Sequence, residues 1–225
     1  MIEGLEQGVL SIVATPIGNL EDITLRALRV LKEVDAIFCE DTRVTSKLLT
    51  RYEISKPLVR CDERAERGAA DRAIEMLGEG KSIALVSDAG TPGISDPGAR
   101  LVALVREAGF EVIAIPGPSA LTAALSIAGI PESEFVFLGF LPHKKGRQTA
   151  LKGIALEKRP VILYESPHRI EKLMNELSEF APEKRAMLFR ELTKMHEQVL
   201  SGTPAELWAR LETSSTRGEF VVIIQ

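Results

Sequence analysis

Short apolar runs alternate with segments of helical spacing along the whole chain. In the first half, the runs 9–14, 36–39, 58–59, 82–86 and 111–115 are rich in Val, Ile, Leu and Ala, which predicts buried strands. Apolar residues recur every three or four positions in 24–32, 45–52, 66–77 and 99–107, which predicts helices between the strands. In the first of these helices, Leu25, Leu28 and Leu31 are expected on the buried face. Strands that alternate with helices predict a parallel, open α/β sheet.

The second half repeats this alternation after an interruption. The stretch "IPGPS", residues 115–119, contains two prolines and a glycine, and such punctuation marks a hinge or a domain boundary. We therefore expect an N-terminal α/β domain over residues 1–116 and a C-terminal α/β domain over residues 117–225. Thr203, Pro204 and Glu206 match the N-cap, first and third positions of a helix. The expected strands are 135–138, 161–164, 186–189, 198–200 and 220–224, with helices over 146–156, 167–180 and 203–211.

Composition narrows the class of protein. The chain has 225 residues, of which 45% are hydrophobic, so a large core is expected and disorder is not. The formal net charge of −4 argues against a surface that is positive throughout but allows a local basic patch. Two cysteines without CxxC spacing and three scattered histidines predict buried thiols and no metal site. An acidic N-terminus, and no apolar stretch approaching about 20 residues, predict a cytoplasmic protein without a signal peptide or membrane span.

The segment "SDAGTPGISDPG", residues 87–98, follows a predicted buried strand and is unusual for a plain connector. Its glycines permit backbone angles and close approaches that a Cβ would forbid, and its prolines fix φ. In open α/β sheets, ligands bind at the carboxyl ends of strands, where this loop lies. Asp88 could accept a hydrogen bond from a ribose hydroxyl or an amine, whereas Asp96 with Pro97 is expected to cap the next helix. The loop as a whole predicts a ligand site.

Two other strand ends carry sequences of the same kind. "TPIGNLEDIT", residues 15–24, follows the first strand, and "CEDTR", residues 39–43, lies at the end of the second. Since the carboxyl ends of parallel strands meet at one edge of a sheet, we expect these segments to share a site. The usual phosphate-binding fingerprints are missing, because "GKS" at 80–82 precedes a predicted strand rather than a helix and no GxGxxG follows a strand.

Six motifs follow one another along the chain: "VATPIGNLEDITLRALRVLKEVDAIFCEDTR", "LVSDAGTPGISDPG", "IPGPSALTAALSIAG", "GFLPHKKGR", "YESPHR" and "RELTK". Together they resemble the family of 16S ribosomal RNA cytidine 2′-O-methyltransferases, within the tetrapyrrole-methylase superfamily. The resemblance implies two α/β domains with S-adenosylmethionine in the cleft between them, and a homodimer. It also implies methyl transfer to the ribose 2′-hydroxyl of a cytidine in the decoding region of 16S rRNA, with the 30S particle as the favoured substrate.

The same resemblance implies which residues contact the cofactor. They are Pro16, Ile17, Asp88, Gly90, Thr91, Pro92, Ser119 and Ala120 in the first three motifs, and Tyr164 and Glu165 from the second domain. One departure bears on the substrate. The porphyrin-type members carry a GxGPGD-like first turn where this chain has "TPIGN", residues 15–19. This departure favours RNA over a tetrapyrrole.

The methyl transfer implied by the resemblance would be helped by a general base, because a ribose hydroxyl is a poor nucleophile until its proton is leaving. "RELTK" offers Glu191 as the base, and Lys194 as a desolvated base or as a cation that stabilises the alkoxide. Asp41 and Arg43 form a second candidate set. Each of these residues could equally form a surface or interdomain ion pair, so the assignment of the base stays open.

Basic residues supply candidate contacts to RNA phosphates. Lys144, Lys145 and Arg147 lie in "HKKGR", and Arg43 shares a predicted helix face with Lys47 and Arg51. The aromatic content of 5% argues against a base-stacking platform for single strands. Two alternatives stay open: a methylase acting on a tetrapyrrole carbon, and a cofactor-binding module without catalysis.

Overall fold

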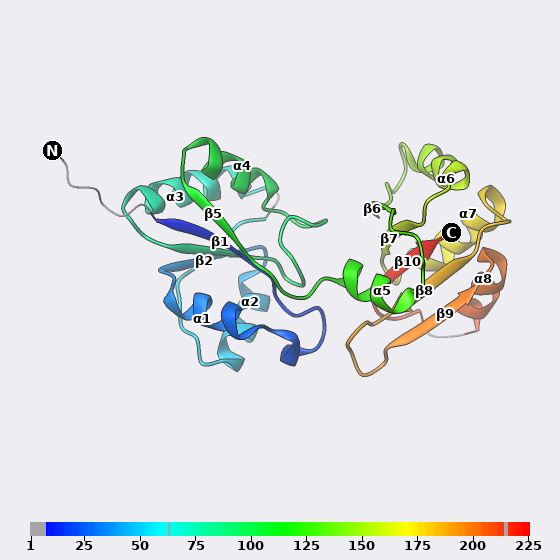
Figure 1. The fold of residues 1–225 in the computed structure, drawn as a ribbon, viewed down its shortest axis with the longest axis horizontal. Coiled ribbons are helices and arrows are strands. Elements are labelled where there is room, and N and C mark those ends of the chain that lie inside the picture. The colour runs from blue at the N-terminus through cyan, green and yellow to red at the C-terminus, as the bar shows by residue number, and fades with distance from the viewer. Residues whose placement is uncertain (1–7, 63, 214–215) are drawn as a thin grey trace. The chain divides into compact units, whose positions relative to one another are not determined.

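The chain forms two compact units, residues 1–119 and 120–225, each built around its own five-stranded sheet (Figure 1). The computed structural model describes residues 8–62, 64–213 and 216–225. The division between the units falls at Ser119, whereas the prolines of the sequence placed a boundary after Pro116. Within the described ranges, none of the helices combines the length and the apolar character needed to cross a membrane.

The first unit is a parallel sheet with helices on both faces. All of its strand pairings are parallel, as the alternation of strands and helices predicts. The strands are β1 (Val9–Val13), β2 (Ala36–Cys39), β3 (Leu58–Arg60), β4 (Ile83–Val86) and β5 (Glu111–Ile115), in the order β3-β2-β4-β1-β5. The helices are η1 (Leu20–Asp22), α1 (Leu25–Glu33), α2 (Thr42–Arg51), α3 (Glu66–Gly78) and α4 (Ala99–Glu107).

The helices of this unit cover the sheet in pairs (Figure 1). α1 and α2 pack on one face through Leu31 and Leu49, and α3 and α4 pack on the other through Leu77 and Leu101. β2 and β4 are buried along their full length, as expected for parallel strands covered on both sides. The adjacent strands β1 and β4 send their connections to opposite faces, to α1 and α4. Such a switch point, at the carboxyl ends of the strands, is where open α/β sheets bind ligands.

The structure corrects local details of the sequence prediction in this unit. Leu25 is 87% exposed rather than buried, because as the first residue of α1 its side chain points back beyond the helix. α2 begins at Thr42 rather than at residue 45, since the Asp41 side chain accepts the Arg43 amide and caps the helix. α4 begins after Gly98, which has a φ of +122°, so Asp96 is not its N-cap.

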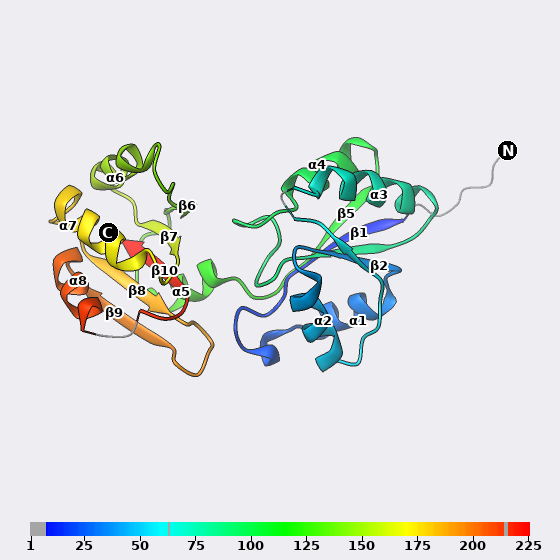
Figure 2. The same ribbon diagram turned by 180° about the vertical axis from the view of Figure 1, so that it is seen from behind.

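The second unit has a mixed sheet. β6 and β7 are parallel, and the other pairs are antiparallel. The strands are β6 (Val136–Phe140), β7 (Val161–Glu165), β8 (Ala186–Arg190), β9 (Gln198–Gly202) and β10 (Phe220–Ile224), in the order β6-β7-β10-β8-β9. α6 (Arg147–Leu156), α7 (Ile170–Phe180) and α8 (Pro204–Glu212) pack against one face of this sheet (Figure 2).

Two helix starts in this unit bear on the sequence prediction. Thr203 and Glu206 form the expected capping box at the start of α8. The short helix α5 (Ala120–Ala128), which contacts β10, was not predicted, because its residues are apolar all round and give no helical stripe. Its start is held by the Tyr164 hydroxyl, which accepts the Leu121 amide at 3.2 Å.

Candidate functional site

The loops after β1, β4 and β5 are joined at the carboxyl edge of the first sheet. The Thr15 amide donates to the Gly90 carbonyl at 2.9 Å, and the Gly90 amide donates back to the Thr15 carbonyl at 3.0 Å. The Thr15 hydroxyl donates to the Ser87 carbonyl at 3.1 Å. On the other side, the Thr91 hydroxyl donates to the Pro118 carbonyl at 3.2 Å. The three loops therefore hold one another in a single arrangement.

Glycine is required where these loops meet. Gly90 has a φ of +83°, and a Cβ there would lie 3.3 Å from Cγ2 of Ile17. A Cβ on Gly117 would lie 3.0 Å from the Cβ of Ala14. Both substitutions would push apart loops that now touch. The glycines of "SDAGTPG" and "IPGPS" thus allow close approach of backbones, one of the roles that the sequence predicted for the first of these loops.

The far end of the 87–98 loop is held by a residue that the sequence did not single out. Oε1 of Glu66, at the start of α3, accepts from the amides of Gly98, Arg100 and Leu101 at 2.9, 3.0 and 3.3 Å. These are the first amides of α4, which has no cap within its own segment. A carboxylate at a helix N-terminus is also favoured by the helix dipole. Glu66 is too far from α4 in sequence for any local capping pattern to reveal it.

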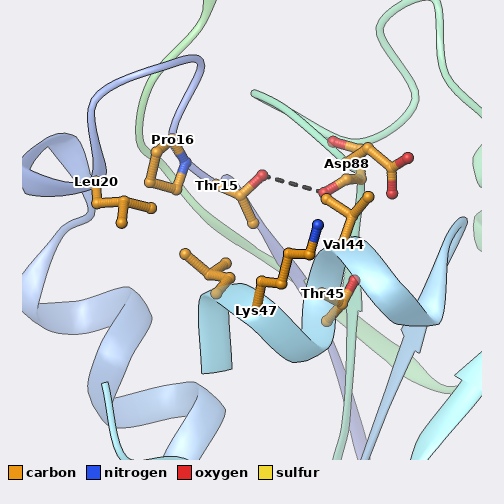
Figure 3. A pocket seen from close by; sticks show the side chains of 9 residues that line it. Thr15, Pro16, Leu20, Val44, Thr45, Lys47 and Asp88 are labelled. Atoms are coloured by element: carbon orange, nitrogen blue, oxygen red, sulfur yellow. Dashed lines mark hydrogen bonds between the residues drawn. The ribbon is translucent and has the colours of Figure 1, made fainter. Parts of the chain in front are cut away.

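A pocket of about 200 Å³ opens beside these loops, between the end of β1, the end of β4 and the helix α2 (Figure 3). Its apolar lining comes from Pro16, Leu20, Val44 and Leu48, and its polar lining from Thr15, Thr45, Lys47, Ser87 and Asp88. Figure 3 shows the Lys47 side chain rising from α2 toward the strand ends that carry Thr15 and Asp88. Val44, Lys47 and Leu48 share one face of α2 because they lie at i, i+3 and i+4.

Carboxylates concentrate at the same edge and shift one another's pKa values. Asp88 Oδ1 accepts the Asp41 amide at 3.1 Å, which ties the end of β4 to the end of β2. Burial, followed by the nearby charge of Asp41, raises the pKa of Asp88. The pKa of Asp41 lies well below its usual range because Arg43 donates to it from both its side chain and its backbone. Asp41 is therefore a poor base, and the Arg43 guanidinium is held against it.

The "RELTK" segment forms a strained turn after β8. Glu191 and Thr193 have φ values of +51° and +66°, which non-glycine residues seldom adopt. Lys194 Nζ lies 2.8 Å from Glu191 Oε1 and 2.9 Å from Glu219 Oε2. Burial lowers the pKa of Lys194, but the bonds to the two carboxylates outweigh it and the pKa rises. The two carboxylates thus favour the cationic form of Lys194 over a neutral base. Glu191 is ionised, because Lys194 and the Glu219 amide lower its pKa against the effect of burial.

The "YESPHR" and "HKKGR" segments meet in the second unit. The side chain of Glu165 is 0% exposed, and its Oε1 lies 3.2 Å from Nε of Arg169. Arg169 in turn reaches Nε2 of His143 at 3.2 Å and donates to the Leu141 carbonyl. This chain of contacts fixes the basic loop to the end of β7. Glu165 Oε1 thus anchors this segment, while Glu165 Oε2 is buried without a hydrogen-bond partner among the described residues.

Arg147 differs from the other basic residues of "HKKGR". It is 4% exposed, and its guanidinium pairs with Glu176 of α7 at 2.7 Å and donates to the Pro142 carbonyl at 3.2 Å. Lys144 and Lys145 are exposed. We therefore remove Arg147 from the candidate RNA contacts, because a buried and neutralised guanidinium cannot reach a phosphate, and we keep the two lysines.

The structure brings together part of the predicted site. Pro16, Ile17, Asp88, Gly90 and Thr91 lie at one edge of the first sheet, as the strand-end argument predicts. The wall formed by α2 was missed because the Asp41 cap was not recognised, which moved the expected helix start past Val44. Among the described residues, no group of three or more His, Cys, Asp or Glu is arranged to hold a metal ion.

Comparisons with known proteins identify the family of this chain. Residues 9–207 match the model of the tetrapyrrole (corrin/porphyrin) methylases. A ribosomal RNA small subunit methyltransferase I from Neisseria meningitidis serogroup B is 48% identical over 96% of this chain and 76% of its own length. One from Thermotoga maritima is 44% identical over 96% of this chain and 98% of its own length. The chain belongs to the tetrapyrrole methylase family, in its group of ribosomal RNA small subunit methyltransferase I proteins.

Solved structures give the same fold at lower identity. A cobalt precorrin-4 methyltransferase superposes with a TM-score of 0.72 at 19% identity, over 100% of this chain and 97% of that one. A uroporphyrin-III C-methyltransferase from Thermus thermophilus superposes with a TM-score of 0.68 at 22% identity, over 96% of this chain and 94% of that one. At these identities the likeness concerns the fold alone. The two-unit α/β fold expected from the sequence is confirmed.

Proposed function

We propose that this chain is an S-adenosylmethionine-dependent methyltransferase that methylates the ribose 2′-hydroxyl of a cytidine in the decoding region of 16S rRNA. One observation carries the proposal: proteins named ribosomal RNA small subunit methyltransferase I match nearly the whole chain at 44–48% identity. The proteins with tetrapyrrole names and solved structures are only 16–22% identical. The substrate proposed is the 30S particle, in the cytoplasm, and the enzyme is proposed to be a homodimer.

The joined loops of the first unit suit the proposed cofactor. A Cβ on Gly90 or Gly117 would lie only 3.3 or 3.0 Å from a neighbouring loop, so the backbone approaches that loop closely at both positions. Exposed carbonyls and carboxylates would accept from the hydroxyls and the ammonium group of S-adenosylmethionine. We keep Ile17, Asp88, Gly90, Thr91 and Pro92 as proposed contacts. Ser119, Ala120 and Tyr164 are kept as well, while Pro16 borders the neighbouring pocket.

The cofactor, when bound, supplies an activated methyl group with its own leaving group. The chain then has to position the ribose hydroxyl and handle its proton. Positioning alone supplies up to about 7–11 kcal/mol of a barrier in favourable cases, and a well-placed base adds about 10²–10⁴-fold. Both candidate carboxylates have lowered pKa values, so the pKa does not distinguish them. Asp41 is engaged as a helix cap, whereas Glu191 lies within a strained turn. Strain of this kind gathers at functional sites. We therefore propose Glu191 as the base and Lys194 as the adjacent cation.

The test separates the substrate classes. The protein and tritium-labelled S-adenosylmethionine are incubated in three separate reactions, with 30S particles, with free 16S rRNA and with a porphyrinogen. Label in the RNA of the particles supports the proposal and shows which form of the RNA is used. Label confined to the porphyrinogen contradicts it.

Single alanine substitutions of Glu191, Lys194 and Asp41 test the assignment of roles. Loss of transfer by about 100-fold or more with unchanged cofactor affinity is expected for Glu191 and Lys194. Asp41→Ala is expected to reduce stability through its lost cap more than it reduces transfer. If all three variants transferred methyl groups as fast as the wild type, the turn that holds Glu191 and Lys194 would have no part in the reaction. If the wild type bound the cofactor but transferred no methyl group, a binding module without catalysis would be favoured.

A further inference from the structure

The pocket between β1, β4 and α2 has an opening that carries unused apolar surface. Leu20 and Val44, which line it, are 41% and 39% exposed. Both are aliphatic side chains at the rim of a concavity, where apolar area left in contact with water favours a ligand with an apolar face. The pocket thus offers a surface that the rest of the first unit does not cover within its described residues.

A buried hydroxyl in the wall of the pocket points to a polar group on that ligand. Thr45 is 3% exposed, and its Oγ1 has no hydrogen-bond partner among the residues that the structure describes. Its polar contact is the thiol of Cys39, which is a weak hydrogen-bonding group. A buried hydroxyl that has only a weak partner leaves hydrogen-bonding capacity unused, so such a group calls for an explanation. A ligand with a donor or acceptor at its inner edge supplies one.

The charge at the opening selects the class of ligand. Lys47 lines the pocket and is exposed, and it forms no ion pair within the described part of the chain. Arg43, Lys47 and Arg51 follow one another at intervals of four residues on α2, so they rise along the helix in steps of about 6 Å. The Arg43 guanidinium is paired with Asp41, whereas Arg51 is exposed like Lys47. A row of exposed cations beside an apolar pocket suits a base with its flanking phosphates.

The size and charge of the pocket argue against the other ligands of the family. At about 200 Å³ the pocket is smaller than the roughly 300–1,000 Å³ of typical ligand sites. A tetrapyrrole or the whole of S-adenosylmethionine is therefore too large, whereas one nucleoside fits in part. S-adenosylmethionine also carries two positive groups against one carboxylate, so Lys47 would repel it.

We propose that this pocket receives the target nucleoside of the RNA, with the base between Leu20 and Val44, the Thr45 hydroxyl at its polar edge and Lys47 on the adjoining phosphate. The inference rests on the proposed function and deepens it, because it names the substrate subsite. Asp88 belongs both to this pocket and to the loop proposed for the cofactor. An occupant of the pocket would thus place its ribose at the border with the methyl donor.

The first test removes the charge. Lys47→Ala is compared with Lys32→Ala, an exposed lysine of the last turn of α1 that does not line the pocket. The measurements are the affinity for 16S rRNA and for 30S particles across a range of salt concentrations, and the Kd for S-adenosylmethionine. Loss of one phosphate contact predicts weaker RNA binding and a decrease of about one in the slope of log K against log salt. The Kd for the cofactor is expected to stay unchanged, and Lys32→Ala is expected to match the wild type.

The second test changes the interior. Val44→Trp fills the pocket from a half-exposed helix position, and Thr45→Val removes only the buried hydroxyl. Blocked methyl transfer by Val44→Trp, and an increase in KM for RNA of about tenfold by Thr45→Val, both with unchanged cofactor Kd and thermal unfolding, support the proposal. A weaker Kd for S-adenosylmethionine in Val44→Trp would assign the pocket to the cofactor and overturn it. Wild-type transfer and RNA affinity in all three pocket variants would also overturn it.

These outcomes are distinguishable from failure of the proposed function. If the wild-type protein labels no RNA in any form, the function itself fails, and the subsite fails with it. If the wild type labels RNA and the pocket variants do so equally well, the function holds and only the subsite is refuted.

Discussion

Glu66 holds the loop at residues 87–98 from a neighbouring helix, and its replacement tests whether the shape of that loop depends on this contact. One carboxylate oxygen accepts from the amides of Gly98, Arg100 and Leu101 at 2.9–3.3 Å. Removing a helix cap costs about 0.5–2 kcal/mol, and a hydrogen bond to a charged group contributes about 1.5–3 kcal/mol. Because Glu66 is half-buried and water can replace part of its role, we expect Glu66→Ala to lose about 2 kcal/mol of unfolding free energy.

Thermal and urea unfolding measure this loss. For a chain of this length, about 2 kcal/mol corresponds to a decrease in Tm of roughly 4–8 °C. Glu75→Ala, at an exposed position of the same helix, is the matched control and should change stability by no more than about 0.5 kcal/mol. Glu66→Gln keeps an acceptor without the charge and should fall between the two. If Glu66→Ala were as stable as the Glu75→Ala control and bound S-adenosylmethionine with the wild-type affinity, Glu66 would not be needed to hold the loop at residues 87–98.

Three further substitutions probe the site and the core. Gly218→Ala would place a Cβ 2.4 Å from Cγ of Glu191 and displace that side chain, so the rate of methyl transfer should fall at least about tenfold. A Cβ on Gly153 would have no heavy atom of another residue within 4 Å, so Gly153→Ala should leave the rate unchanged. Gly90→Ala, at a φ of +83°, should weaken S-adenosylmethionine binding measured by calorimetry, and Gly68→Ala should not. Burial raises the pKa of the Cys61 thiol to about 12 from 9.0, so only the unfolded chain ionises there between these pH values. The stability of the wild type relative to Cys61→Ala should therefore be constant below pH 9 and decline above it, by at most about 1.4 kcal/mol per pH unit. A flat difference up to pH 11 in urea titrations would contradict the last prediction.

The fold of the first unit followed from sequence because its signals are local. Apolar runs such as 83–86 become fully buried parallel strands, and the alternation with helices sets their direction. The capping box of Thr203 and Glu206 was equally visible, since both partners lie within four residues. Helix α5 left no such signal, because its apolar residues show no single stripe.

The site was predictable at the level of strand ends but not of contacts. Placing the loops after β1 and β4 at one edge needed only the parallel topology. By contrast, the Glu66 contact with α4 joins residues more than 30 positions apart, and the burial of Arg147 depends on Glu176 of α7. The sequence of "HKKGR" is the same whether its arginine faces solvent or the core. Only packing between separate helices distinguishes the two cases.

The identity of the methylated nucleoside is the sharpest test of the proposed activity. After reaction of the wild-type protein with 30S particles and labelled S-adenosylmethionine, the 16S rRNA is digested to nucleosides and analysed by mass spectrometry. We expect a single new product, 2′-O-methylcytidine, which carries the label. Label on a base carbon or nitrogen, or RNA that stays unlabelled while a porphyrinogen is methylated, would contradict it.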